Sequence, residues 1–200
     1  AWVGLLYYFN FVQTEYMKEA SDAAKTDVTK KLAPRALWWF RWAAVFTFLT
    51  GVLLLGHIHN MRLTLAISIG ALIGTIMFLN VWLIIWPNQK IVIGLASGDK
   101  AKAAPRAGLA SRTNTLLSLP MLYFMIASAH ASPLANGGIW GATENLSVST
   151  AALVLTLIII GVIEINAIWG KMIGLIQSVR AVITSSVILT AVMAGAIYYA

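Results

Sequence analysis

Three histidines are the residues of this sequence best suited to hold a haem or a metal ion. His57 and His59 follow one long apolar stretch, and His130 follows another. Neutral imidazole is a ligand for haem iron, copper and zinc. Because His57 and His130 end different stretches at the same depth, we predict that a cofactor, most simply a b-type haem, uses these two. The alternative interpretation is that all three are solvated side chains near a membrane surface.

A second set of polar residues lies inside the apolar stretches themselves. Counted from the nearest end of its stretch, Arg41 is about 10 Å inside and Glu164 about 8 Å inside. Ionisable groups within membrane spans are costly and usually face a cavity or a partner. The same third of the bundle holds Asn10, Gln13, Asn80 and Asn166, and Asn114 lies at the edge of its stretch.

We therefore predict a catalytic or binding group consisting of Glu164, Arg41, Asn80 and Asn10. In this hypothesis Glu164 faces the bundle interior, held by Arg41 or by the amides of Asn10, Asn80 and Asn166, and lines a pocket. Two alternatives stay open. Polar residues cluster near helix ends in general, and the long side chain of Arg41 can reach the membrane surface unaided. Glu164 can also be a purely structural tie between two helices.

Several chemical classes are excluded by what the sequence lacks. It has no phosphate-binding glycine loop, no H-E-x-x-H motif and no nucleophile elbow. It has no cysteine. Disulfides, thiolate metal sites, covalently attached c-type haem and cysteine-ligated iron–sulfur clusters are therefore excluded within these 200 residues.

The elements that would position these residues are long apolar helices. Apolar residues make up 60% of the chain and charged residues 10%, against roughly a quarter charged in soluble domains. The pattern predicts an all-α fold, a polytopic transmembrane bundle of about six helices that forms one integral membrane domain over residues 1–200. The expected helices cover residues 1–17, 34–56, 63–86, 113–129, 148–169 and 181–200, with Pro34 at a helix start, Pro87 at a helix end and Pro120 inside the fourth.

The basic residues indicate how the bundle is oriented. They gather in every second gap: Lys18, Lys25, Lys30, Lys31 and Arg35, then Lys90, Lys100, Lys102, Arg106 and Arg112, then Lys171 and Arg180. Positive loops stay cytoplasmic during insertion. We therefore predict a bacterial inner-membrane protein with cytoplasmic basic loops and periplasmic termini. The net charge of +7 is explained by this topology and by attraction to the lipid bilayer, so no nucleic-acid partner is expected.

Three local patterns add detail to this topology. The first basic gap has apolar residues at helical spacing and an Asp27–Lys31 pair, which predicts a surface helix rather than a linker. Gly70 and Gly74 form a small-xxx-small pair, interpreted as close helix packing. Most of the tryptophans fall near the predicted cytoplasmic ends, as in an interfacial aromatic belt.

Four aromatic-rich strings carry a resemblance to a known family. They are WVGLLYYFNFVQ at residues 2–13, PRALWWFRW at 34–42, IWPNQK at 85–90 and SRTNTLLSLP at 111–120. These strings resemble the membrane domain of the bacterial urate oxidase N-terminal family. In fused members, the resemblance implies, this domain precedes a periplasmic cytochrome c and oxidises urate. The present chain has no Cys-x-x-Cys-His motif and so resembles the short stand-alone members.

Two functions follow as expectations. The first is an integral membrane redox subunit that passes electrons toward a periplasmic cytochrome c or a larger electron-transport complex. The alternative is a non-catalytic accessory or assembly subunit of a respiratory or photosynthetic complex, packed against other membrane subunits. A small transporter is disfavoured because no broken helix pair with repeat symmetry is visible. The sequence opens on an apolar run without Met, and we expect the native chain to begin upstream of Ala1.

Overall fold

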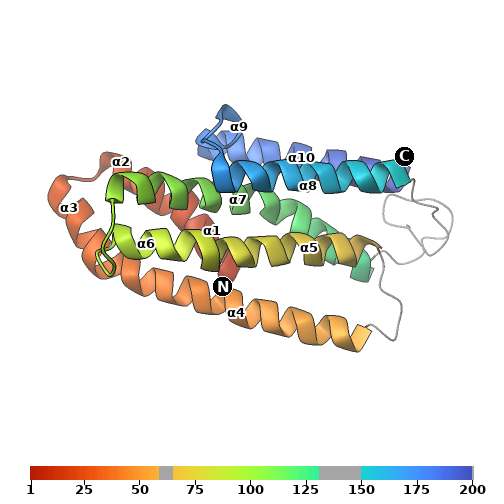
Figure 1. The fold of residues 1–200 in the computed structure, drawn as a ribbon, viewed down its shortest axis with the longest axis horizontal. Coiled ribbons are helices and arrows are strands. Elements are labelled where there is room, and N and C mark those ends of the chain that lie inside the picture. The colour runs from red at the N-terminus through yellow and green to blue at the C-terminus, as the bar shows by residue number, and fades with distance from the viewer. Residues whose placement is uncertain (59–64, 131–149, 200) are drawn as a thin grey trace.

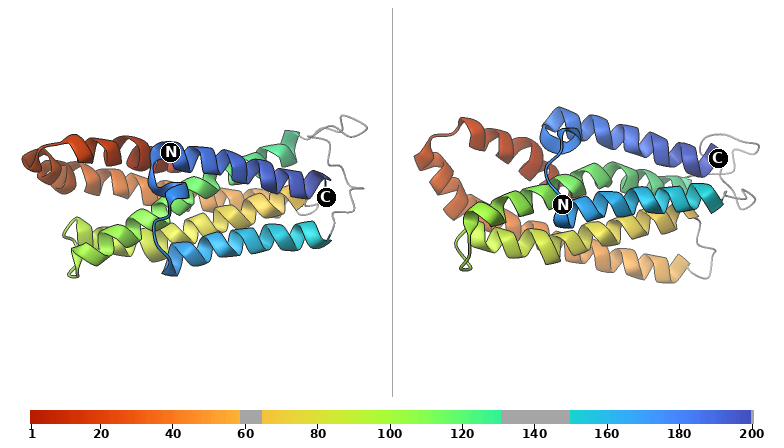
Figure 2. Two further views of the ribbon diagram at one scale, coloured as in Figure 1. Left: turned by 90° about the horizontal axis from the view of Figure 1, so that it is seen from above. Right: turned by 45° about the horizontal axis from the view of Figure 1, so that its top comes forward.

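The computed structural model describes residues 1–58, 65–130 and 150–199, and this part of the chain is helical with no strand. Long helices run up and down along one axis (Figure 1, Figure 2). The elements are α1 (Trp2–Tyr7), η1 (Tyr8–Gln13), α2 (Thr14–Glu19), α3 (Asp22–Asp27), η2 (Val28–Leu32), α4 (Ala33–Ile58), α5 (Leu65–Leu79), η4 (Asn80–Ile85), α6 (Trp86–Val92), α7 (Lys100–His130), α8 (Thr150–Trp169), α9 (Gly174–Gln177) and α10 (Val179–Tyr199). The η elements are π-helical segments that continue into their α-helical neighbours.

Four helices of the described part are long and apolar enough to cross a membrane. They are Asp22–His57, Leu65–Val92, Thr150–Trp169 and Val179–Ile197. The predicted all-α class is therefore confirmed and membrane insertion is indicated, with four spans rather than six meeting this criterion. α7 is long enough but too polar, and its polar residues Thr113, Asn114 and Ser118 are buried by other helices. Average apolarity does not distinguish a polar face turned inward from one turned to lipid.

α7 is the central helix of the bundle. It packs against α1, α5, α6, α8, α9 and α10, whereas α4 lies at the edge against α1 and α5. The main core is formed by residues of α1, α4, α5, η4, α7, α8 and α10. Its fully buried members include Leu6, Ile73, Met77, Leu117 and Phe124. α7 is therefore the helix against which the other long helices, apart from α4, pack.

Two predicted helix boundaries are wrong for a shared reason. Pro34 was expected to start a helix and Pro87 to end one, yet the chain stays helical through both. A π-helical segment comes directly before each, at η2 and η4. Because proline lacks the N–H and its ring crowds the preceding turn, widening that turn lets the helix continue. The predicted surface helix is accordingly the beginning of the second long helix, and its Asp27–Lys31 ion pair is confirmed at 2.5 Å.

Pro120 lies inside α7, as predicted, and has a consequence for α10. Without an N–H, Pro120 cannot donate to the carbonyl of Leu116 four residues earlier. The hydroxyl of Ser186 in α10 donates to that carbonyl at 2.7 Å. A neighbouring helix thus supplies the hydrogen bond that proline removes, as membrane bundles generally require.

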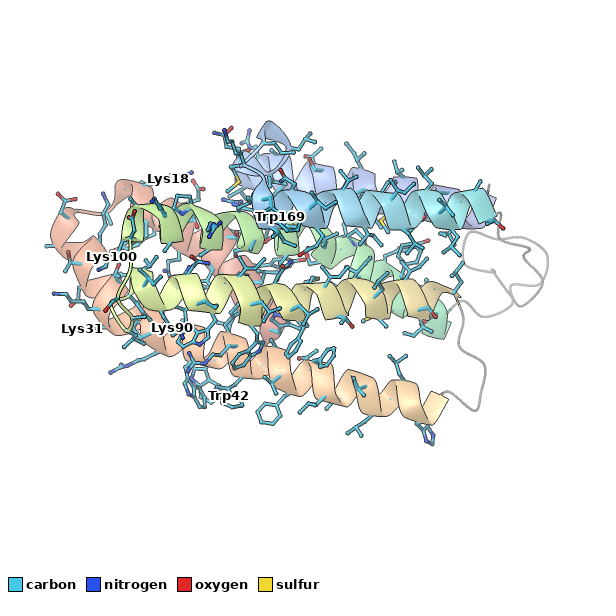
Figure 3. The ribbon with its side chains drawn as sticks, viewed as in Figure 1. Lys18, Lys31, Trp42, Lys90, Lys100 and Trp169 are labelled. Atoms are coloured by element: carbon cyan, nitrogen blue, oxygen red, sulfur yellow. The ribbon has the colours of Figure 1, made fainter. Side chains whose placement is uncertain are left out.

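One end of the bundle collects the basic side chains. Lys18, Lys31, Lys90 and Lys100 lie there, beyond the ends of α8 and α10 (Figure 3). We call it the basic end. Trp42 lies between this end and the apolar half, and Trp169, which is 75% exposed, lies at the corresponding end of α8. The C-terminus is at the opposite end, and Ala1 lies beside the middle of the bundle (Figure 1).

The predicted close packing at Gly70 and Gly74 is confirmed against α7. A Cβ placed on Gly70 would come within 2.9 Å of Met125 Cγ and 3.1 Å of its backbone nitrogen, and one on Gly74 within 3.3 Å of Met125 Cε. Gly51 of α4, in contrast, has nothing within 4 Å of such a Cβ.

We expect Gly70→Ala to destabilise the protein by about 1–3 kcal/mol, because the added methyl overpacks the contact between α5 and α7. Gly51→Ala is the matched control and should be neutral or slightly stabilising, since alanine is the better helix former. Thermal unfolding of both variants in one detergent measures the difference. Equal stability of the two would show that the glycine contact does not limit packing.

Candidate functional site

A hydrogen-bonded group of three side chains joins three long helices. Asn80, the first residue of η4, donates from Nδ2 to Asn114 Oδ1 of α7 and to Glu164 Oε2 of α8, each at 3.0 Å. Asn114 in turn donates to the carbonyl of Met77 at 2.9 Å. Asn80 and Asn114 are buried and Glu164 is half-buried. The structure therefore brings Glu164 and Asn80 together, with Asn114 as an additional member. We call these three residues the amide–carboxylate network.

Arg41 is not part of this network. Its guanidinium lies over the ring of Trp86 in α6, 3.7 Å from the ring centroid, and Lys90 approaches the same ring at 5.8 Å. This cation–π contact offers Arg41 a partner that sequence spacing did not reveal. Asn166 lies two residues from Glu164 on α8, and neighbouring helical positions point in different directions. The expectation that Arg41 or Asn166 holds Glu164 is not met.

Asn10 lies in a different polar contact, between the first long helix and α7. Its Nδ2 donates to the carbonyl of Leu6 at 2.9 Å and to Ser111 Oγ at 2.8 Å. One turn away, Tyr7 and Ser118 hydroxyls are 2.8 Å apart. Asn10 lies in η1 as Asn80 lies in η4. π-Helical turns are rare and occur often at functional sites, so both segments mark candidate positions.

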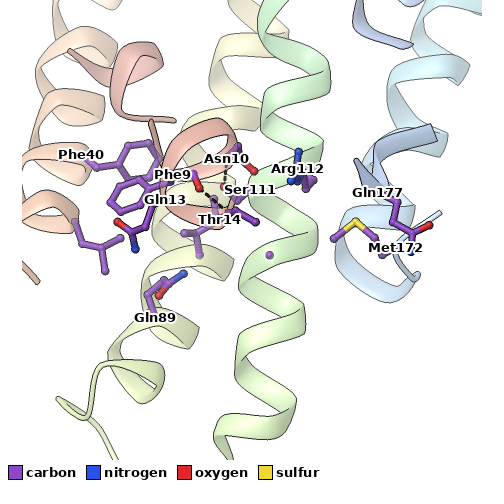
Figure 4. A pocket seen from close by; sticks show the side chains of 13 residues that line it. Phe9, Asn10, Gln13, Thr14, Phe40, Gln89, Ser111, Arg112, Met172 and Gln177 are labelled. Atoms are coloured by element: carbon purple, nitrogen blue, oxygen red, sulfur yellow. Dashed lines mark hydrogen bonds between the residues drawn. The ribbon is translucent and has the colours of Figure 1, made fainter. Parts of the chain in front are cut away.

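A pocket of about 260 Å³ opens beside Asn10 on the side of the basic end (Figure 4). It lies among η1, α2, α4, η4, α6, α7, α9 and the segment that leads into α9. Its walls are both polar and apolar, and the lining residues are Phe9, Asn10, Gln13, Thr14, Leu37, Phe40, Ile85, Gln89, Gly108, Ser111, Arg112, Met172 and Gln177. Glu164 and Arg41 are not among them. This is therefore not the predicted pocket, which was to be lined by Glu164: of the predicted group only Asn10 lies in its wall, and its charged residue is Arg112.

That charged residue is Arg112, which sequence analysis treated as one basic residue of a loop. It is 5% exposed, and its Nη1 has no hydrogen-bond partner among the described residues. The side-chain oxygen of Gln13 is likewise buried without a partner there. The misassignment arose because α7 begins at Lys100, thirteen residues before the predicted helix start, so Arg112 lies within a packed helix. The unbroken run of polar residues at 111–115 is the feature of the sequence that indicates a buried polar site here.

α7 connects the pocket to the amide–carboxylate network. Ser111 contacts Asn10 at the pocket, and Asn114 follows Ser111 by three residues, about 4.5 Å farther along the helix axis. Side chains three apart lie on neighbouring parts of one helix face. The polar face of α7 therefore runs from the pocket toward Glu164.

His57 and the end of α7 at His130 lie at the opposite end of the bundle from the pocket. His57 is in the last turn of α4 with an exposed side chain, and His130 ends α7 at the same end (Figure 1). His59 and the side chain of His130 lie outside the described residues. Within the described part, no cluster of three or more His, Asp or Glu could hold a metal ion. Of the two predicted haem ligands, only His57 has a described side chain, an exposed imidazole of the type that ligates haem iron.

A family model described as Urate oxidase N-terminal matches residues 57–194. The chain belongs to this family. The matched segment of this urate oxidase N-terminal protein contains the amide–carboxylate network and Arg112, and it begins after Asn10 and Arg41. A search of curated proteins and a search of solved structures gave no match.

In this member of the urate oxidase N-terminal family, we expect Asn114→Leu to destabilise the fold by about 1–3 kcal/mol. The substitution leaves the Met77 carbonyl without its side-chain donor and removes one acceptor from Asn80. Asn88→Leu is the control: Asn88 donates only to Ile84 in its own helix, at 2.7 Å, so no other helix loses a contact. Thermal unfolding in detergent compares the two. A loss in Asn88→Leu as large as that in Asn114→Leu would contradict a specific role for the network.

Proposed function

We propose that the protein is an integral membrane redox subunit of the urate-oxidase type. It takes a polar, planar substrate such as urate from the cytoplasm into the pocket lined by Asn10, Gln13 and Arg112, which we call the Arg112 pocket. It then passes electrons toward the periplasmic face. The acceptor is a periplasmic cytochrome c or a larger electron-transport complex. The observation that carries this proposal is a pocket lined by a buried arginine whose Nη1 has no hydrogen-bond partner among the described residues, in a family named for urate oxidation.

The proposed orientation rests on charge and aromatic residues. The basic end is the cytoplasmic end in this proposal, because positive loops are retained inside. Exposed Trp38, Trp39 and Trp169 form the interfacial belt beside it. α7 is a fifth span in this proposal, and the first long helix runs from the basic end to the middle of the bundle, where Ala1 lies. The stretch at 130–147, which has no Lys or Arg, is assigned to the periplasmic side.

Cysteine labelling tests the orientation. In intact cells, a membrane-impermeant thiol reagent should label Asn136→Cys and leave Asp99→Cys unlabelled until the cells are permeabilised. The native chain segment has no cysteine that would interfere. Labelling of Asp99→Cys from outside would reverse the proposed topology.

Each residue of the predicted catalytic group has a place in this proposal. Asn10 shapes the pocket wall, and Asn80 orients Glu164 through the 3.0 Å hydrogen bond. Glu164 does not line the pocket, so its proposed role is to accept a proton relayed along the polar face of α7, since oxidation of such a ring releases protons along with electrons. Arg41 fixes Trp86 and so the position of α6 beside the pocket. A b-type haem at His57 and His130 would supply the electron exit at the opposite end.

The redox proposal predicts that purified protein shows a reduced-minus-oxidised b-haem band and that urate-dependent reduction of cytochrome c requires Glu164. Glu164→Gln keeps the shape and an oxygen that accepts from Asn80 but removes the charge. We expect activity to fall at least tenfold while thermal stability changes by less than about 1 kcal/mol. Absorbance spectroscopy and cytochrome c reduction in membranes measure the two effects.

The histidines provide the internal comparison. His57→Ala and His130→Ala should abolish the haem band, because loss of an axial ligand releases or alters the haem. An unchanged haem band in both variants would show that neither histidine is a haem ligand. Full activity in Glu164→Gln would assign Glu164 a purely structural role.

The accessory role remains the second candidate, and the exposure of α4 favours it. Trp39, Phe46, Leu53 and Leu54 of α4 are each more than half exposed, and α4 contacts the rest of the bundle along one side only. Such a face can be covered by lipid, pigment or another subunit. A colourless protein that copurifies with a respiratory or photosynthetic complex would decide for this role.

A further inference from the structure

We propose that the Arg112 pocket is a binding site for a small planar organic anion that also carries an N–H donor. Every element of this proposal comes from side chains that line the pocket. The proposal deepens the proposed function, because it names the residues that take up the substrate, but binding at this site requires no electron transfer. It can therefore be tested separately from the redox role.

Arg112 selects the charge of the ligand. The ion pairs of the described residues join Lys18 to Glu15, Lys25 to Asp22, Lys31 to Asp27 and Lys102 to Asp99, each within one helix, and Arg112 belongs to none. A buried guanidinium with an unpaired N–H is costly unless an acceptor reaches it. Because Arg112 lines the pocket, a ligand anion can supply that acceptor.

Gln13 adds the requirement for a donor. Its Oε1 is buried without a partner among the described side chains, so only an N–H or O–H can satisfy it. Neighbouring Asn10 cannot serve, because its Nδ2 already donates to Leu6 and Ser111. A ligand that presents an anionic oxygen to Arg112 and an N–H to Gln13 satisfies both groups at once.

The remaining walls set size and shape. Phe9 and Phe40 meet edge to face with ring centroids 5.7 Å apart, and Leu37 and Ile85 complete the apolar side. Aromatic walls favour flat ligands. The volume of about 260 Å³ is at the lower limit of small-molecule pockets, which suits one or two fused rings.

An anion with an N–H donor can come from two sources, a soluble heterocycle or the head group of an aminophospholipid. The apolar and aromatic walls favour the soluble heterocycle, because a head group is neither flat nor apolar. Nanodiscs of phosphatidylcholine, which lacks an N–H donor, exclude the lipid source. Nanodiscs of phosphatidylethanolamine supply it.

Equilibrium dialysis against nanodisc-embedded protein tests the site with two probes, urate and benzoate. Both are planar anions, but only urate has ring N–H donors. Arg112→Gln should weaken both probes about ten- to a hundredfold. Gln13→Leu should weaken urate about three- to tenfold and leave benzoate unchanged. Arg106→Gln, which removes the same charge from an exposed position six residues earlier on α7, should change neither.

A second variant keeps the test decisive if Arg112→Gln fails to fold. A Cβ on Gly108 meets no atom within 4 Å, so Gly108→Leu can fill the pocket without displacing the helices. It should abolish binding of both probes, whereas Gly51→Leu, on the open face of α4, should not. Circular dichroism of each variant verifies the helical fold.

Three outcomes would overturn the inference: no binding of either probe in phosphatidylcholine nanodiscs, unchanged binding in Gly108→Leu, or binding of urate that phosphatidylethanolamine abolishes. Binding that depends on Arg112 without any cytochrome c reduction would support this site and contradict the redox role. Reduction of cytochrome c that is unaffected by Gly108→Leu would support the redox role and contradict this binding site.

Discussion

A polar side chain buried among apolar helices must find its hydrogen-bond partner on a neighbouring helix, and this requirement determines how the bundle is assembled. Among the described residues α7 carries half of the buried polar side chains, and three other long helices form hydrogen bonds to it. Asn114 reaches Asn80 and Met77, Ser111 receives Asn10, and Leu116 receives Ser186. Apolar packing alone would not fix the rotation of each helix, because lipid and side chains are equally apolar. The polar contacts supply that specificity.

The same requirement separates two kinds of polar residue in this protein. Asn80, Asn114 and Glu164 are joined to one another by hydrogen bonds. Arg112 and Gln13 are buried with groups that the described residues leave unsatisfied. Natural folds retain few such groups, and those that persist call for an explanation. Both groups line the same pocket, and this moves the chemical interest from Glu164 toward the basic end.

The sequence was sufficient for the class of fold, the approximate helices and the glycine contact at Gly70, and it placed Asn80 among the candidate partners of Glu164. Depth along a helix follows from residue number, which is why these residues could be matched. The direction in which a side chain points around the helix axis does not follow from residue number. Arg41 was therefore matched to Glu164 in depth, but its guanidinium lies over the ring of Trp86. Arg112 was missed because charge density near a predicted boundary is typical of a loop. Hydropathy cannot show that a polar helix is enclosed by other helices.

The bond from Ser186 to Leu116 also bears on how the chain is assembled in the membrane. Pro120 leaves the Leu116 carbonyl without its intrahelical donor from the moment α7 is made, and its replacement comes from α10, the last described helix to be synthesised. An open carbonyl facing lipid is costly. Until α10 arrives, the central helix is therefore incomplete, and a chain truncated before α10 exposes a polar defect at its centre. The proline therefore makes α7 depend on α10 for a hydrogen bond near its centre.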